Sequence, residues 1–288
     1  MFLLPVPRAQ AKPIKLTVDG TNIFARVRGD SQALVYGMNV AATDAVAMVL
    51  PLPTPPDVAE DAVRFIDLSG YPKLFVDLNE CFPPILPPAS RGGFGQAGGV
   101  AVERTLKVHD AGDFEASFVP SIDDVDRIDP RFRLPPGIWE ALPQYRDWSF
   151  AVFQLRDVVT PAKGFRRWFG GGPRPKTIHP MAFEFPRRFT DRLFFPTVHL
   201  HEQQLHERDA FDHALFWQLD PGTRGEFWSE SPTHIGTLHT PETASVHVNI
   251  AATQGLVAGD QTVSRVELRG EYANQDHWVR TAPKADRS

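Results

Sequence analysis

Histidines are the residues of this sequence whose spacing best suits chemistry. His199 and His201 are two positions apart, and His179 and His213 stand in the segments before and after them. On a strand, side chains two positions apart point to the same face, roughly 6.5 Å apart along it. Two imidazoles in that arrangement can hold a divalent transition metal, with His179 or His213 completing the set. Zn, Fe, Cu, Ni and Mn suit such nitrogen ligands with carboxylates nearby.

The same histidines have a second interpretation that needs no metal. The chain contains 10 histidines, so an H-x-H pair can arise by chance, and it lacks the fixed spacing of an H-E-x-x-H motif. His201 and His206 are five positions apart, which on one helix turns their rings about 140° from each other. In this alternative, His199 and His201 lie on the solvated face of a strand whose Val198 and Leu200 face the core.

Basic and aromatic side chains gather in a Gly- and Pro-rich segment, residues 161–176. The candidate binding residues there are Arg166, Arg167, Trp168 and Arg174. Such a segment can grip phosphates and stack bases, or anchor a protein interface. It can also be a solvated hairpin loop with Trp168 folded back onto the body. The net charge of −5 argues against nucleic acid, so the expected partner is a protein or a small molecule.

Cys81 is the single cysteine, which excludes an intramolecular disulfide. A nucleophilic thiol needs a lowered pKa and a histidine brought close by the fold. The neighbouring Glu80 disfavours the thiolate, so we predict a buried, apolar role for Cys81.

The elements that position these residues are predicted to be mainly strands. The 27 prolines interrupt long helices, and the 21 phenylalanines and 6 tryptophans suit a pleated, half-buried surface. We expect an α+β fold, predominantly β, with mixed or antiparallel sheets, a few short helices and long Pro/Gly-rich loops. Helices are predicted at residues 57–68 and 74–82. Strands are predicted in the segments 177–185, 193–201, 210–219 and 245–250.

One domain is expected over residues 1–288, because the Gly-rich loops 85–99 and 161–176 interrupt a continuing strand pattern. A subdivision near 85–99 is the alternative, and residues 281–288 are expected to be a frayed tail. No stretch has the ~20 apolar residues of a membrane span. The first ten residues lack the pattern of a signal peptide, so we expect a cytoplasmic protein without membrane contact.

Three stretches, in the same order, resemble a bacterial family of unknown function. The first is the V-L-P-x-P strand ending at residues 49–53, and the second is the segment 108–155, with a strand, two short helices and an aromatic strand. The third is residues 178–185, with a proline and an F-x-F-P ending. The resemblance covers roughly residues 30–200 and implies a fold type, with no activity or catalytic residue to carry over.

Two functional hypotheses from different classes follow. The first, which we prefer, is a non-enzymatic binding or interaction protein that presents loops 85–99 and 161–176 to its partner. The second is a metal-dependent enzyme, a hydrolase or an oxidoreductase, with His199 and His201 as ligands and His179 or His213 completing the site. An open coordination position would then activate water or oxygen.

Overall fold

The alternation of buried and exposed side chains organises this chain into sheets. The structure, a computed structural model, describes residues 2–5, 16–42, 46–82, 108–111, 114–127, 142–155, 176–200, 205–228 and 236–283. Strands predominate over helices in these ranges, which confirms the predicted α+β, mainly β class. Loop 85–99, residues 161–175 and His201 lie outside the described residues.

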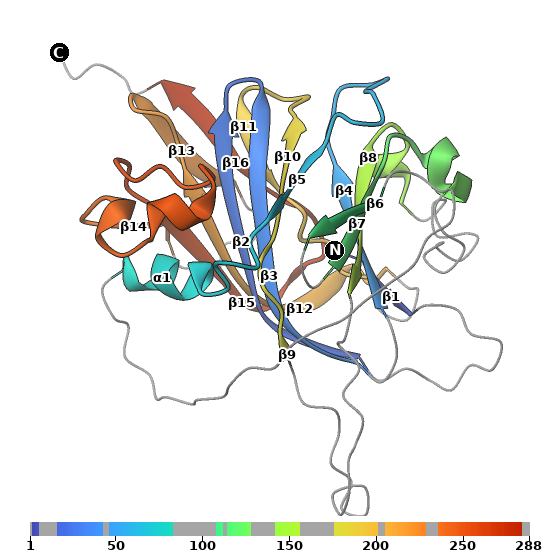
Figure 1. The fold of residues 1–288 in the computed structure, drawn as a ribbon, viewed down its shortest axis with the longest axis horizontal. Coiled ribbons are helices and arrows are strands. Elements are labelled where there is room, and N and C mark those ends of the chain that lie inside the picture. Colours follow the sequence, from blue (N-terminus) through green and yellow to red (C-terminus); the bar gives the residue numbers. More distant parts are fainter. Residues whose placement is uncertain are drawn as a thin grey trace, which may run out of the picture.

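The largest sheet has eight strands and forms the centre of the molecule (Figure 1). Its order is β14-β15-β12-β2-β3-β10-β5, with β9 paired to β3. All its pairs are antiparallel except β12 with β2. The strands are β2 (Leu16–Arg28), β3 (Ser31–Ala42), β5 (Arg64–Asp67), β9 (Lys176–Thr177), β10 (Met181–Pro186), β12 (Arg208–Gln218), β14 (Leu238–His239) and β15 (Ser264–Ala273).

Two smaller antiparallel sheets flank this one. The five-stranded sheet has the order β1-β4-β8-β7-β6 and the three-stranded sheet the order β11-β16-β13. The strands of the first are β1 (Phe2–Pro5), β4 (Val46–Leu52), β6 (Val108–Ala111), β7 (Phe114–Val119) and β8 (Ser149–Leu155). Those of the second are β11 (Arg192–Phe195), β13 (Thr223–Trp228) and β16 (His277–Pro283).

The main core lies where the three sheets face one another. It joins side chains such as Tyr36 of the eight-stranded sheet, Phe153 of the five-stranded sheet and Val279 of the three-stranded sheet, all buried. The second half of β12 is buried at every position, since its sheet is covered on both faces. Large aromatic side chains dominate this core, as the phenylalanine-rich composition predicts.

The opposite face of the eight-stranded sheet is covered by short helices. The helix α1 (Leu74–Glu80) lies beside the segment containing the 3₁₀ helices η5 (Ala244–Val246) and η6 (Ile250–Thr253) (Figure 1). Phe75 of α1 and Val248 pack with Phe216 of β12 in one buried cluster. Two further 3₁₀ helices, η1 (Ile122–Arg127) and η3 (Pro143–Tyr145), cover the outer face of the five-stranded sheet. The helix predicted at 74–82 is therefore confirmed.

Four local predictions were wrong. The strand predicted at 193–201 ends at Phe195, and His199 lies in the irregular segment that follows. Residues 57–68 form turns and then β5, because Ile66 packs in the cluster with α1 while the adjacent Phe65 packs against the main core on the other face, the alternation of a strand. Residues 245–250 form 3₁₀ turns because Ala244 and Val248 are buried at a helical spacing, and Asn249 accepts a bond from the Ala252 amide. The expected fraying does not begin at Thr281, because residues 281–283 extend β16 and pair with β13.

None of the helices within the described ranges has the length and apolar character needed to cross a bilayer.

Candidate functional site

Two buried histidines face each other beside the main core. His199 follows β11 in an irregular segment, and His213 lies in the middle of β12, opposite Thr21 of β2 and Leu268 of β15. Their Nε2 atoms are 3.2 Å apart, and both residues are buried, at 7% and 3% exposure. The backbone amide of His199 donates to the side chain of Asn274, which fixes the position of this segment.

Further groups surround this pair. Nδ1 of His199 lies 3.6 Å from a carboxylate oxygen of Asp209, and the ring of His199 stacks on Phe211 at 4.6 Å between centroids. Burial, reinforced by the neighbouring His199, holds the pKa of His213 well below its ordinary value. The folded protein therefore favours the neutral form of this imidazole over the charged form.

A second, partly buried polar group lies close to the histidine pair. The carboxylate of Asp276 accepts bonds from the Tyr145 hydroxyl and from the backbone amides of Thr197 and Val198. His277 hydrogen-bonds the Thr197 hydroxyl at 2.7 Å, and its ring contacts Phe211. These bonds tie the segment 197–199 to the β15–β16 connection.

Two other residues were predicted as metal ligands, His179 and His201. His179 is buried against the ring of Phe114, with 4.2 Å between centroids, and its Nδ1 lies 3.2 Å from the Pro180 carbonyl oxygen. His201 lies outside the described residues, so its pairing with His199 stays a prediction. Within the described ranges, no group of three or more His, Cys, Asp or Glu side chains is arranged to hold a metal.

The three-stranded sheet carries a surface rich in arginine and tryptophan. Residues directly opposite on paired strands share one face. Trp278 is opposite Phe194 on one side and Trp228 on the other, and Arg280 is opposite Arg192. We call the surface formed by Arg192, Trp228, Trp278 and Arg280 the Arg–Trp face.

Cation–π contacts connect this face. The guanidinium of Arg280 lies 3.9 Å from the ring centroid of Trp228, whose side chain is 43% exposed. The guanidinium of Arg192 lies 5.2 Å from the ring of Phe189 and 5.7 Å from that of Trp278. Cation–π contacts restrict the conformations of arginine side chains on a surface. Less conformational entropy is then lost when these side chains form hydrogen bonds.

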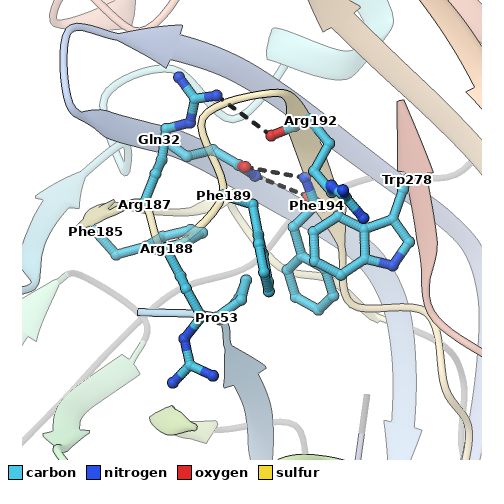
Figure 2. Close-up of a pocket in the computed structure, with 9 residues that line it drawn as sticks. All are labelled: Gln32, Pro53, Phe185, Arg187, Arg188, Phe189, Arg192, Phe194 and Trp278. Atoms are coloured by element: carbon cyan, nitrogen blue, oxygen red, sulfur yellow. Dashed lines mark hydrogen bonds between the residues drawn. The ribbon is translucent and has the colours of Figure 1, made fainter. Parts of the chain in front are cut away.

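A small hollow of about 10 Å³ opens beside Trp278, at the connection between β10 and β11 (Figure 2). In Figure 2 the rings of Phe189, Phe194 and Trp278 gather around it, while the guanidinium of Arg188 is directed away. Its lining residues are Gln32, Pro53, Phe185, Arg187, Arg188, Phe189, Arg192, Phe194 and Trp278.

The arginines around the hollow differ in their partners. Arg188 binds the carboxylate of Asp147, and Arg192 binds that of Asp191 through two parallel bonds. Arg187 donates to the backbone carbonyls of Thr190 and Arg192, and its buried Nε has no hydrogen-bond partner among the described residues.

Sequence reasoning missed this surface. The binding residues it selected, Arg166, Arg167, Trp168 and Arg174, lie outside the described ranges. The i, i+2 spacing of Trp278 and Arg280 is a signal that both share one face of a strand, but their neighbours depend on register.

Cys81 directly follows α1 and is buried, at 5% exposure. Burial, together with the nearby Asp77, raises the pKa of its thiol to about 11. The thiol therefore stays protonated near neutral pH, as an apolar role requires.

The fold and these sites define a mainly antiparallel β protein with a buried histidine pair and a partly exposed Arg–Trp face. No protein-family profile matches the sequence, and no curated protein matches it. Among solved structures, the crystal structure of baculovirus P35 is similar, with 14% identity and a TM-score of 0.42 over 94% of this chain and 99% of that chain. This likeness is distant.

Proposed function

We propose that this protein is a non-enzymatic binding protein that holds an acidic segment of a partner protein on the Arg–Trp face. The observation that carries the proposal is the exposed stack of Arg280 on Trp228. Arginine and tryptophan are the residues that most often anchor protein interfaces. A stacked guanidinium still presents its N–H donors to an acceptor, since the ring covers only its face.

Charge favours an acidic partner. Within the described part of the chain, no carboxylate lies within ion-pair distance of Arg280 or Arg187. Arg188 and Arg192, in contrast, are already neutralised by Asp147 and Asp191. A partner carboxylate can bind a guanidinium through two parallel hydrogen bonds, which gives both affinity and orientation.

The size of the hollow favours a peptide over a metabolite. Sites for drug-sized molecules enclose about 300–1,000 Å³. The hollow beside Trp278 has only about 10 Å³, room for about one water molecule, so it cannot enclose a metabolite and a partner would bind across the surface. Loops 85–99 and 161–176 stay the predicted binding elements from sequence, and the Arg–Trp face is proposed in addition to them.

The test is a peptide titration against the full chain. A fluorescently labelled peptide of alternating Asp, Glu and Gly is titrated at low salt and followed by anisotropy, beside a Lys-containing peptide of equal length. We expect binding of the acidic peptide only, weakened at least about fivefold by Arg280→Gln and by Trp228→Ala. Added salt should weaken it further.

Two control variants test whether peptide binding depends on the Arg–Trp face or only on the overall charge of the protein. Arg208→Gln removes an exposed arginine of β12, and Val76→Ala removes an exposed apolar side chain of α1. Both variants should bind like the unaltered protein. Equal binding by the Arg280→Gln and Arg208→Gln variants would contradict the proposal.

A further inference from the structure

The separation of the two facing imidazoles matches that of two ligands on one metal ion. Zn²⁺ binds imidazole nitrogen at about 2.05 Å, so two nitrogens at a tetrahedral angle lie about 3.3 Å apart. The Nε2 atoms of His199 and His213 are 3.2 Å apart. The fold holds both residues in place. The backbone amide of His199 donates to Asn274, and His213 lies within the paired strand β12.

The distance between the centroids of the two rings supports the same interpretation. An ion on the lone-pair axes of both Nε2 atoms, about 2.05 Å from each, places the ring centroids about 5.0 Å apart. A straight N–H···N bond of the observed length would place the centroids about 5.5 Å apart. The centroids of His199 and His213 are 4.9 Å apart, with an angle of 36° between the ring planes. The observed centroid distance agrees with two imidazoles on one ion and is shorter than that of a straight hydrogen bond.

A carboxylate lies near the other ring nitrogen of His199, slightly beyond hydrogen-bond distance. A histidine that binds a metal through one nitrogen commonly donates the other N–H to a carboxylate, which fixes its tautomer. Asp209 lies 3.6 Å from Nδ1 of His199, on the far side of the ring from His213. Its negative charge also offsets part of the charge of a divalent cation in this buried place.

We propose that His199 and His213 bind one divalent transition-metal ion through their Nε2 atoms, with Asp209 as the carboxylate that orients His199. Zn²⁺ fits best, because it combines imidazole ligands with a tetrahedral angle. Since the described ranges supply no third protein ligand, water or a small anion completes the coordination. The site is independent of the Arg–Trp face, so either proposal can fail alone.

The test uses Co²⁺, whose visible absorption reports the number and type of its ligands. The full chain is stripped with a chelator and titrated with Co²⁺, and Zn²⁺ is then added as a competitor. We expect one Co²⁺ per chain, a spectrum of a four-coordinate imidazole site, and displacement by Zn²⁺. A chain that takes up neither ion, or gives only the spectrum of hydrated Co²⁺, would overturn the proposal without any variant.

Variants assign the ligands. His199→Gln and His213→Gln should each raise the Kd for Co²⁺ at least about tenfold, and Asp209→Asn by about tenfold, as loss of an outer carboxylate does. His239→Gln, at an exposed histidine, is the matched control and should leave the Kd unchanged. Circular dichroism confirms that each variant is folded. Unchanged uptake by a folded His199→Gln/His213→Gln double variant would assign the metal elsewhere and reject the site.

Discussion

Gln32 holds the backbone of Phe194 with both ends of its side-chain amide. Nε2 of Gln32 donates to the Phe194 carbonyl oxygen at 2.7 Å, and the Phe194 amide donates to Oε1 at 2.9 Å. The first residue lies at the start of β3 and the second in β11, so this pair ties the eight-stranded sheet to the three-stranded sheet. It thereby positions the Arg–Trp face, since Phe194 lies opposite Trp278.

Replacement of Gln32 should therefore destabilise the protein. Gln32→Leu leaves a buried amide and a buried carbonyl without partners, each costing about 1–3 kcal/mol. Gln32→Glu should behave similarly, because a carboxylate cannot donate to the Phe194 carbonyl. Urea unfolding measures both, with the exposed Thr262→Ala as a control expected within about 0.5 kcal/mol of the unaltered protein. A Gln32→Leu variant as stable as the control would show that the bonds are not needed.

Gly37 of β3 leaves room for the ring of Phe75 of α1. A Cβ atom at Gly37 would lie 2.6 Å from two ring carbons of Phe75. Gly37→Ala should cost about 1–3 kcal/mol through overpacking. The smaller side chain in Phe75→Leu should recover part of this loss when both changes are combined. Strictly additive effects in the double-mutant cycle would mean that the two residues are not in contact.

The carboxyl of Asp276 should make stability fall as the pH rises. Burial raises its pKa above the ordinary value of 3.8, despite the hydrogen bonds it accepts from Tyr145, Val198 and Thr197. The folded protein therefore holds this proton more tightly than the unfolded chain. The full stability is present below pH 3.8 and is lost as the pH rises through the folded-state pKa.

An Asp276→Asn variant isolates this effect. The amide oxygen can still accept from the backbone amides of Thr197 and Val198, and its NH₂ group can donate to the Tyr145 hydroxyl. Urea unfolding over a series of pH values above 3.8 should show a smaller decline in the variant than in the unaltered protein. Parallel curves would exclude Asp276 as the source of the decline.

Cys81 should be unreactive in the folded protein. With a pKa of about 11, only on the order of a thousandth of the thiol is ionised at pH 8. A coloured thiol reagent should label the native chain far more slowly than a free cysteine and should label the urea-unfolded chain at the ordinary rate. Rapid labelling of the native chain would instead indicate a reactive thiol.

Glu226 offers a change that should strengthen the proposed interaction. It is exposed and lies opposite Arg280 on β13, so its charge repels an acidic peptide on the Arg–Trp face. Glu226→Gln should lower the Kd of the acidic peptide about two- to fivefold, an effect reduced by salt. The Glu242→Gln variant, at an exposed glutamate outside this sheet, should bind like the unaltered protein. Weaker binding by Glu226→Gln would argue against an acidic partner.

Local pattern accounts for the elements that the sequence predicts well. The strand predicted at 210–219 is confirmed as β12, and the helix at 74–82 as α1, because each carries a long apolar pattern that a single period explains. The segment 57–68 was misread because only four residues of it form a strand. Those residues gain their stability from pairing with β10, a contact that local pattern does not contain.

The candidate sites also combine features that local sequence predicts with features that depend on tertiary contacts. The sequence by itself determined the β class and the buried thiol, since composition and periodicity are local properties, and it predicted a set of histidines suited to a metal. Only the tertiary structure decided that His199 meets His213, because this contact joins an irregular segment to a strand held between β2 and β15. The Arg–Trp face likewise depends on the register of three strands, and register is fixed by burial across the whole sheet.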